Sequence, residues 1–450
     1  MVLQLSQKNP HYLEFRGKPI VLIGSGEHYG AVLNQEFDYL TYLDEIARAG
    51  LNLTRLFSGT YREIPGSFQI KHNTLAPRRG AYVCPWAQAG SGAGAGEEVY
   101  DLKRYSADYF ARLKDFLREA ERRDVIVELV LFCFYYTDQL WQNSPLWIGN
   151  NVNGVGDCSR LQVYRIDKTK LLEFQKKLVQ KLAGELNGFD NLYYEIINEP
   201  YVLFNGESFL GWQNCMIDAL VQAESKLPKK HLIAQNIYNR TFHVESLHPA
   251  VSILNFHYAL PSAAGANYHL NRPIADDETG FAGQEPLPYR REAWRFMLCG
   301  GAIVSHLDYS YTTDHPDGTE SDLDQTPGCG GPEMRRQLLV LREFIERFDF
   351  VALKPHDEII LNLAYNPNVQ IHALGNPGKE YAVYITGGEE VTTELGIPEG
   401  TYQVEWIDTV NGALIRRETM NAMSGHAAQN RLVSPRFAED IALRIVRAKS

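Results

Sequence analysis

The chain has 450 residues, and its 44 lysines and arginines against 55 aspartates and glutamates give a formal net charge of −11. This acidic balance without basic patches is unsuited to neutralising nucleic-acid phosphates, and 44% hydrophobic with 22% charged residues is a globular composition that excludes wholesale disorder. The length fits a barrel of about 250 residues or more with one appendage, or two to three ordinary domains.

The first two-thirds of the chain alternate short apolar runs with longer amphipathic segments. The runs lack strict alternation, as expected of parallel strands covered on both faces. They lie at 19–24, 52–57, 125–134, 192–197, 231–235, 252–256, 273–277 and 302–307. Helix-like segments lie at 37–49, 106–123, 168–186, 211–225, 290–299 and 332–347, and the fifth and sixth connections are too short for full helices. We predict an α/β fold, a (β/α)8 TIM barrel over residues 1–353; an open doubly wound sheet is the alternative, but no Gly-x-Gly-x-x-Gly pattern follows a strand.

The last part of the chain has a different pattern. Six strand-like runs occur at hairpin spacing, at 359–363, 369–373, 381–386, 402–408, 414–418 and 441–446. The pair Asn411-Gly412 favours a tight hairpin between two of them. We predict a small all-β sandwich domain over residues 354–450, docked rigidly on the barrel.

Two carboxylates are placed where barrel chemistry occurs. The fourth strand ends in Asn198-Glu199-Pro200, and the seventh ends at Glu278. Strands four and seven are opposed across an eight-stranded barrel, so the two side chains can flank one bond. Glycoside hydrolysis with retention needs two carboxylates about 5–5.5 Å apart, one as acid/base and one as nucleophile. This predicts Glu199 as acid/base and Glu278 as nucleophile, with Asn198 bonding the sugar 2-hydroxyl.

Neighbouring residues separate the roles of the two carboxylates. Arg55, near the end of the second strand, is expected to hold Glu278 ionised while burial keeps Glu199 protonated. Glu195 lies on the same side of its strand as Glu199 and is expected to pair with a buried arginine. The competing nucleophiles are Asp277, which strand alternation turns to the other face, and Glu285, which lies beyond the strand.

These motifs resemble the clan-A glycoside hydrolases, especially the cellulase-type family. The matching segments are 50–55 (Gly-Leu-Asn-Leu-Thr-Arg), 194–200, His257-Tyr258 and 277–280, in the clan's order, within a region that spans about 19–348. The resemblance implies that Glu199 and Glu278 are acid/base and nucleophile, and that Arg55, Asn198, His257 and Tyr258 line the subsite of the cleaved sugar. The third strand ends without that family's histidine and the eighth without its tryptophan, so the motifs support the clan more firmly than the family.

Further substrate-binding candidates are Glu27, His28, Tyr135, Trp86, Trp141, Trp147 and Asp308. Glu27 and His28 end the first strand, where they bind sugar hydroxyls or only anchor a loop. The aromatic residues belong to two long connections, 58–101 and 135–167, where they form sugar platforms or pack the loops against the barrel. The stretch 306–324 is rich in acids and histidines, and we interpret it as a solvated loop rather than a metal site; a metal there would be a structural calcium.

We therefore expect a retaining β-glycoside hydrolase that acts on a β-linked oligo- or polysaccharide of β-glucan type, without cofactor or catalytic metal. The expected partner is carbohydrate, with no nucleic acid or membrane; endo or exo action and oligomeric state are open. The alternatives are a non-catalytic carbohydrate-binding protein and a metal-dependent barrel hydrolase that uses His306 and Asp308. The first fifteen residues lack a signal-peptide pattern and the six cysteines are scattered, which favours a cytoplasmic location, with a trimmed secretion signal as the alternative.

Overall fold

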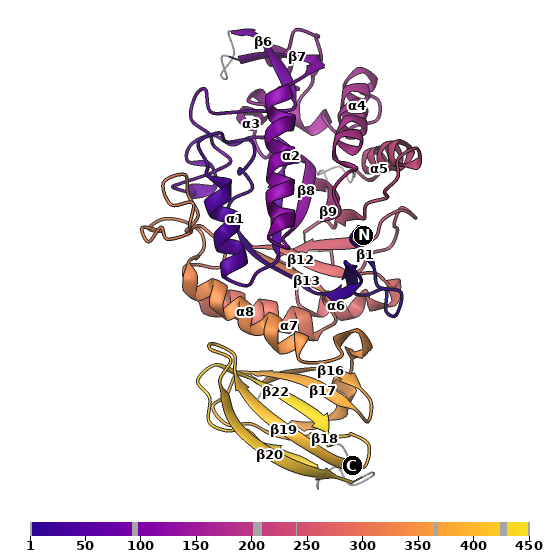
Figure 1. Cartoon of the computed structure of the whole chain (residues 1–450), viewed down its shortest axis with the longest axis vertical. Coiled ribbons are helices and arrows are strands. Elements are labelled where there is room, and N and C mark those ends of the chain that lie inside the picture. Colours follow the sequence, from indigo (N-terminus) through magenta and orange to yellow (C-terminus); the bar gives the residue numbers. More distant parts are fainter. Residues whose placement is uncertain are drawn as a thin grey trace.

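The computed structural model describes residues 2–91, 98–200, 209–239, 241–363, 368–423 and 430–448. Within these ranges, eight parallel strands form a closed barrel in chain order, which confirms the predicted fold class (Figure 1). The barrel strands are β4 (Leu22–Gly26), β5 (Leu53–Phe57), β8 (Ile126–Cys133), β9 (Leu192–Asn198), β10 (Ile233–Asn236), β11 (Ile253–His257), β12 (Ile274–Thr279) and β13 (Ile303–Leu307). All eight strands are buried along their whole length, which explains their apolar runs.

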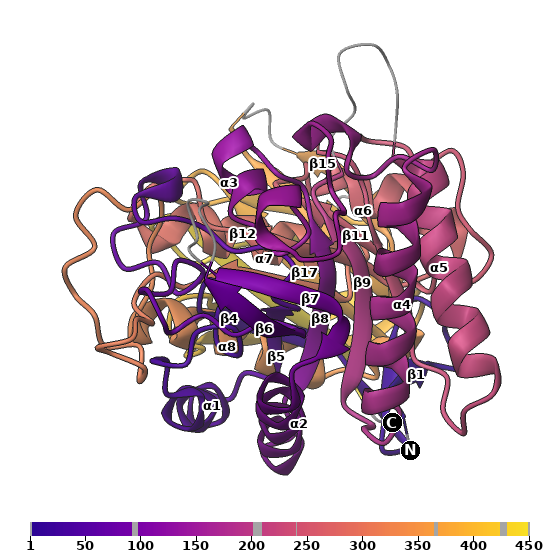
Figure 2. The same cartoon turned by 90° about the horizontal axis from the view of Figure 1, so that it is seen from above.

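Helices cover the outside of the barrel, as α1, α2, α4 and α5 show when the molecule is viewed from above (Figure 2). The long helices are α1 (Tyr39–Arg48), α2 (Ala107–Arg122), α4 (Thr169–Leu186), α5 (Leu210–Ser225), α7 (Pro286–Leu298) and α8 (Pro332–Glu346). Gly50 follows the end of α1 with a φ of +70°, a conformation that favours glycine. After β11 there is only the five-residue α6 (Ser262–Ala266), as the short connection predicted. Among the helices described, none combines the length and apolarity needed to cross a membrane.

The long connections contain structure that the sequence pattern did not predict. The first holds an antiparallel pair, β6 (Trp86–Ser91) and β7 (Glu98–Tyr105), and the second holds the short helix α3 (Asp138–Gln142). Before the barrel, the strands β1 (Gln4–Leu5), β2 (Leu13–Phe15) and β3 (Lys18–Ile20) form a small antiparallel sheet. These elements lie around the barrel and do not change its topology.

The C-terminal region contains two antiparallel sheets. One has the order β14-β16-β17-β22-β19-β20 and the other β15-β18-β21. The strands are β14 (Lys354–Pro355), β15 (Ile360–Leu363), β16 (Gln370–Asn376), β17 (Glu380–Thr386), β18 (Thr392–Leu395), β19 (Gly400–Asp408), β20 (Leu414–Ala422), β21 (Arg431–Val433) and β22 (Asp440–Arg447). All six predicted strands are present, whereas β14, β18 and β21 were missed because they are short. The turn at Asn411-Gly412 does join two antiparallel strands, but five residues separate β19 from β20, so the hairpin is wider than a two-residue turn.

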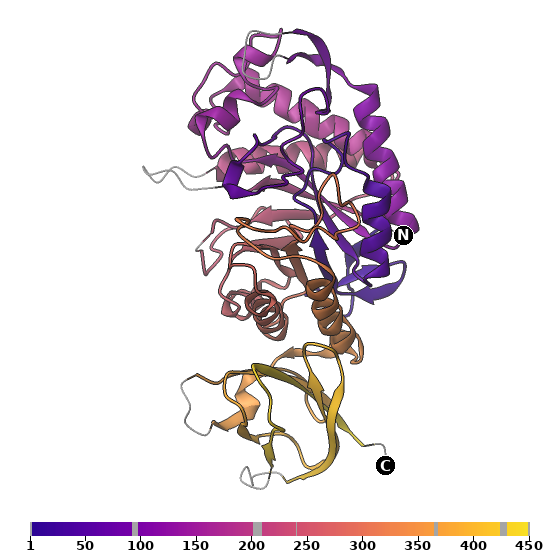
Figure 3. The same cartoon turned by 90° about the vertical axis from the view of Figure 1, so that its left-hand side faces the viewer.

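The C-terminal sheets pack against α7 and α8, which lie between them and the barrel (Figures 1 and 3). Arg290 of α7 forms a buried ion pair with Asp440, with 2.9 Å between Nη2 and Oδ1. Asp440 also accepts a 2.7 Å hydrogen bond from the Tyr384 hydroxyl, and the Tyr384 ring stacks on Trp294 at 5.3 Å. Buried rings around a paired charge make this contact a packed interface rather than a loose tether.

Candidate active site

A cavity of about 230 Å³ opens at the carboxyl ends of the barrel strands. It is lined by His28, Tyr29, Phe57, Glu63, Phe68, Leu75, Cys133, Tyr136, Asn198, Glu199, Tyr258, Glu278 and Phe281. The carboxyl ends of the strands are the face on which barrel enzymes carry their active sites. The cavity is therefore the candidate active site.

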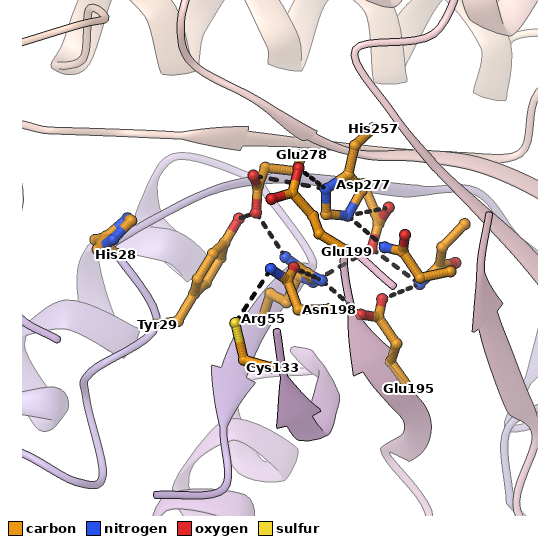
Figure 4. Close-up of polar contacts among 12 residues, drawn as sticks. His28, Tyr29, Arg55, Cys133, Glu195, Asn198, Glu199, His257, Asp277 and Glu278 are labelled. Carbon is orange, nitrogen blue, oxygen red and sulfur yellow. Dashed lines mark hydrogen bonds and ion pairs between the residues drawn. The ribbon is translucent and has the colours of Figure 1, made fainter. Parts of the chain in front are cut away.

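The two predicted catalytic carboxylates face each other in this cavity. His257 lies between them, with Nδ1 3.4 Å from Glu199 Oε1 and 3.6 Å from Glu278 Oε1 (Figure 4). One oxygen of Glu199 and one of Glu278 lie within 4.8 Å of each other. The opposed tips of β9 and β12 thus bring the two carboxylates to a separation that spans one bond.

Glu278 is held by three hydrogen-bond donors. Its Oε2 accepts from the Tyr29 hydroxyl at 2.8 Å and from Arg55 Nη1 at 2.9 Å. Its Oε1 accepts from the hydroxyl of Tyr258. Donors on both oxygens fix the orientation of this side chain in the cavity.

Arg55 joins the carboxylates at the base of the cavity. Its Nη2 donates to Glu195 at 2.8 Å and to Asn198 Oδ1 at 2.7 Å. The predicted pairing of Glu195 with a buried arginine is confirmed. Burial lowers the pKa of Arg55, but the charges of Glu195 and Asp277 outweigh it and raise that pKa well above its usual value.

Strand alternation predicted that Asp277 points to the face opposite Glu278, but in the structure it does not. Its Oδ2 lies 3.2 Å from Arg55 Nε and accepts a 2.9 Å hydrogen bond from Asn255. The register of β12 shifts against both neighbouring strands, and this irregularity turns Asp277 and Glu278 to the same side. Asp277 lies below Glu278 and pairs with Arg55, which suits it to support rather than to attack.

The protonation expected of Glu199 is wrong. Its Oε2 accepts from the Tyr136 hydroxyl and its Oε1 from Asn239 Nδ2, both at 2.6 Å. Burial raises the pKa of Glu199, but His257, Tyr136 and Asn239 together lower it to about 2. For His257, burial lowers the pKa, whereas Glu278 and Asp277 raise it well above 6.5. The proton of this cluster therefore resides on His257 rather than on Glu199.

Backbone strain is concentrated at the cavity. Nine described residues other than glycine have a positive φ, and four of them line it: Tyr29, Phe68, Glu199 and Tyr258, with values from +50° to +60°. This left-handed conformation is unfavourable for side chains that carry a Cβ, and it persists where the surrounding structure holds it. Strain at four lining residues marks this cavity as a functional site.

The predicted aromatic platforms lie elsewhere. Trp86 and Trp141 are buried, and Trp141 Nε1 donates to the Cys158 carbonyl at 2.8 Å. The Tyr135 hydroxyl donates to the Thr60 carbonyl at 3.1 Å, and Trp147 packs over Gly149. For Trp86, Trp141 and Tyr135, burial decides between the two alternatives in favour of packing the long loops against the barrel. Trp147 is partly buried outside the cavity lining, so its role as a sugar platform stays a prediction.

Glu27 and Asp308, two predicted substrate-binding residues, form hydrogen bonds within the protein. Glu27 accepts hydrogen bonds from the backbone N–H groups of Gly30 and Ala31, at 2.8 and 2.9 Å, and so anchors its own loop. Asp308 accepts a 2.6 Å hydrogen bond from Arg335 Nη1. Both positions correct the expectation of a substrate-binding role, whereas His28 does line the cavity.

Several lining or supporting residues were missed: Tyr29, Glu63, Phe68, Tyr136, Asn239 and Phe281. Tyr29, Tyr136 and Phe281 each lie within three residues of the end of a barrel strand, and this position was a usable signal. Glu63 and Phe68 lie inside a long loop, where the sequence carries no such signal.

Among the described residues, two groups of side chains have the composition of a metal site: Glu199 with His257 and Glu278, and Glu195 with His257 and Asp277. The carboxylates of the first group are already engaged by Tyr29, Tyr136 and Tyr258, and Arg55 lies against both groups. A guanidinium within 2.9 Å of Glu278 opposes a second cation there. The residues of the metal-dependent alternative are also engaged, since His306 contacts Thr279 and Asp308 contacts Arg335.

Comparisons with known proteins identify relatives by structure alone. The sequence matches no protein-family model and no curated protein. A structure described as a glycoside hydrolase covers 100% of this chain and 97% of its own, with a TM-score of 0.63 and 14% identity. A glycoside hydrolase family 5 structure from Bacteroides vulgatus ATCC 8482 covers 99% and 93%, with a TM-score of 0.63 and 13% identity. The endo-1,4-beta-mannanase from Rhizomucor miehei covers 73% and 98%, with a TM-score of 0.50 and 12% identity.

These likenesses establish the fold of the chain. The first two extend over the C-terminal sheets as well as the barrel. The chain thus shares its fold, the barrel together with the C-terminal antiparallel sheets, with these two structures, while the cellulase-type resemblance stays a prediction from motifs.

Proposed function

We propose that this protein is a retaining β-glycoside hydrolase, with Glu278 as nucleophile and Glu199 as acid/base. The observation that carries the proposal is the approach of their carboxylate oxygens to within 4.8 Å. Retaining enzymes hold their carboxylates about 5–5.5 Å apart, whereas inverting enzymes leave about 6.5–9.5 Å for a water molecule. An approach to within 4.8 Å leaves less room than the separation in inverting enzymes, and it supports direct attack of Glu278 on the anomeric carbon.

In the first step, Glu278 attacks the anomeric carbon and forms a glycosyl ester while the glycosidic C–O bond breaks. Glu199 delivers a proton to the departing oxygen, and His257 Nδ1, 3.4 Å from Glu199 Oε1, supplies that proton. In the second step, Glu199 takes a proton from water, the resulting hydroxide attacks the anomeric carbon, and Glu278 leaves as a carboxylate. The proton on Glu199 then returns to His257, which restores the starting state. Arg55, Tyr29 and Tyr258 stabilise Glu278 whenever it carries the negative charge.

The proposed substrate is a β-linked oligo- or polysaccharide of neutral hexoses. The motifs point to β-glucans, while a structural neighbour is described as a mannanase. A screen of aryl β-glucosides, aryl β-mannosides and the matching oligosaccharides would identify the sugar.

Replacement of the nucleophile tests the mechanism. We expect Glu278→Ala to lower kcat by a factor on the order of 10³ or more, and azide to restore turnover as a glycosyl azide of inverted configuration. Glu285→Ala is the matched control, because Glu285 is exposed beyond β12 and should keep normal activity. Near-normal activity of Glu278→Ala, or a first product of inverted anomeric configuration, would refute the assignment. Saturable binding of an oligosaccharide without cleavage would favour the non-catalytic alternative.

A further inference from the structure

The cavity has a deep part and an open mouth. Glu199 and Glu278 are buried, and so are His28 after β4, Phe57 at the end of β5, and Glu63 and Leu75 in the loop after β5. The mouth carries the exposed rings Phe68, Tyr258 and Phe281, which are 38%, 38% and 43% exposed. The described lining is therefore buried around His28 and Glu63 and exposed at three aromatic rings, of which Phe68 belongs to the loop after β5.

We propose that this cavity is a blind pocket for one terminal, neutral sugar unit, and that the pair His28–Glu63 binds the hydroxyl groups of that unit. The protein would then act as an exo-glycosidase that releases single sugars from the non-reducing end. This inference rests on the proposed glycosidase function.

The size and the position of the polar pair support a single-unit pocket. A volume of about 230 Å³ is below the range of about 300–1,000 Å³ for drug-sized ligands, so the cavity does not enclose a chain of several sugars. His28 Nε2 lies 3.3 Å from Glu63 Oε2, deep in the wall. Glu63 is fixed by hydrogen bonds from Tyr61 and Asn73, which leaves its orientation little freedom.

One polar atom of the His28–Glu63 pair lacks a hydrogen bond within the part of the chain that the structure describes. His28 Nδ1 is buried and has no hydrogen-bond partner among the described residues. A buried polar atom without a partner is unfavourable, and such atoms are commonly satisfied by a ligand or a water molecule. A sugar hydroxyl beside the ring would supply the missing partner.

The charges of the lining define the class of sugar. Three carboxylates line the cavity, Glu63, Glu199 and Glu278, and His28 is the titratable base among the lining residues. Two buried cations lie beside the cavity, and both are already engaged: Arg55 contacts Glu195, Asp277 and Glu278, and His257 contacts Glu199 and Glu278. A uronic acid would bring a fourth negative charge into this site, so the pocket favours neutral sugars.

The rings at the mouth fit the rest of the substrate. Phe68 meets Tyr136 edge to face at 5.0 Å, and Phe281 meets Tyr258 in the same way at 5.8 Å. Tyr136 and Tyr258 in turn hold Glu199 and Glu278, so the exposed rings flank the position of the scissile bond. Beyond that bond, an apolar sugar face or an aryl group can pack against them.

Product analysis tests exo action directly. With a β-linked pentasaccharide labelled at its reducing end, we expect single sugars and a ladder of products that shorten by one unit at a time. Early di- and trisaccharides from internal cleavage would overturn the inference while leaving the glycosidase function intact. Absence of any cleavage by the wild-type chain would instead count against the proposed function.

Binding to the Glu278→Ala variant tests the pocket independently of turnover. We expect calorimetry to detect D-glucose or D-mannose but not D-glucuronic acid. Adding His28→Ala or Glu63→Gln should weaken that binding at least tenfold, with far-UV circular dichroism to confirm folding. His315→Ala, at an exposed histidine in another loop, is the matched control and should leave binding unchanged. Tighter binding of glucuronic acid, or unchanged binding after both pocket substitutions, would contradict the inference.

Discussion

Two buried arginines at the same end of the barrel have opposite surroundings. Arg335 of α8 meets Asp308 at 2.6 Å and Glu45 at 3.2 Å. Asp308 is further satisfied by Ser310 and by the backbone N–H of Gly331. Burial raises the pKa of Asp308, but Arg335 and Ser310 outweigh it and lower that pKa. This centre is a charge-balanced ion pair that fastens α8 to the end of β13.

The centre around Arg55 carries a surplus of acids. Arg55 and His257 share the barrel interior with five carboxyl groups: Glu128, Glu195, Glu199, Asp277 and Glu278. Burial and the charge of Asp277 raise the pKa of Glu128 well above its usual value, and burial raises that of Glu195 to about 7 although Arg55 opposes it. Unbalanced buried charge destabilises a fold, and its persistence here is typical of a site that moves protons. The contrast sets the structural Arg335 against Arg55, to which the proposed function gives a role at the nucleophile.

The largest expected effect comes from removing each arginine. Arg55→Met and Arg335→Met each leave buried carboxylates without their positively charged partner. We therefore expect each substitution to lower the free energy of unfolding by about 3–5 kcal/mol. Only Arg55→Met should also lower kcat of the folded protein, by more than about a hundredfold, because it removes a donor from Glu278. Urea unfolding and kcat per folded molecule, measured at low temperature, check both parts. Equal losses of kcat in the two variants would abolish the distinction between the centres.

Two buried histidines should give the centres opposite pH dependence. Burial lowers the pKa of His306 to about 4, so the folded state favours the neutral ring. Stability from this group is present above pH 6.5 and is lost as the pH falls toward 4, by up to about 3 kcal/mol. The pKa of His257 is raised in the folded state. Its contribution to the free energy of unfolding is therefore full below pH 6.5 and is lost as the pH rises through its pKa in the folded protein.

We therefore expect the destabilisation caused by His306→Gln to shrink between pH 7 and pH 4, and that caused by His257→Gln to shrink above pH 6.5. Chemical denaturation of each variant and of the wild type across pH 4–9 measures both differences. Parallel curves for the two variants would show that the histidines do not differ in this way.

The hydroxyls on Glu278 should have a smaller but specific effect. Hydrogen bonds to charged groups contribute about 1.5–3 kcal/mol, so Tyr29→Phe and Tyr258→Phe should each lower kcat/KM by about 10–100-fold. Tyr135→Phe is the matched control, since its hydroxyl bonds the Thr60 carbonyl outside the cavity. A Tyr29→Phe variant with normal kcat/KM would remove Tyr29 from the catalytic group.

The sequence predicted the barrel well because burial on both faces leaves a clear pattern. The run from Ile126 to Cys133 is apolar except for Glu128, and it is strand β8. In contrast, the two-residue β14 and the half-exposed β18 and β21 leave no such pattern, because short edge strands contain few buried side chains.

The site was predictable where chemistry sits at a strand end, as for Glu199, Glu278 and Arg55. It was not predictable where the backbone departs from regular geometry, as at the register shift that turns Asp277 inward. The protonation of Glu199 depends on Tyr136 and Asn239, which approach from other loops, and no local pattern encodes that approach. The sequence also did not show that Trp141 is buried and Phe281 exposed, because both rings lie in connections that follow barrel strands.

The smallest expected effect tests whether the two centres are independent. Ser310 Oγ donates to Asp308 Oδ1, and Asp308 keeps donors from Arg335, Ser25 and Gly331 when that hydroxyl is removed. Ser310→Ala should therefore lower the free energy of unfolding by only about 1 kcal/mol and leave kcat/KM unchanged. Thr326→Ala, which removes another buried hydroxyl from the same loop, is the control for a general effect on that loop. A loss of kcat/KM in Ser310→Ala but not in Thr326→Ala would mean that the Arg335 centre positions the catalytic residues, because a purely structural pair transmits nothing to Glu278 once the protein is folded.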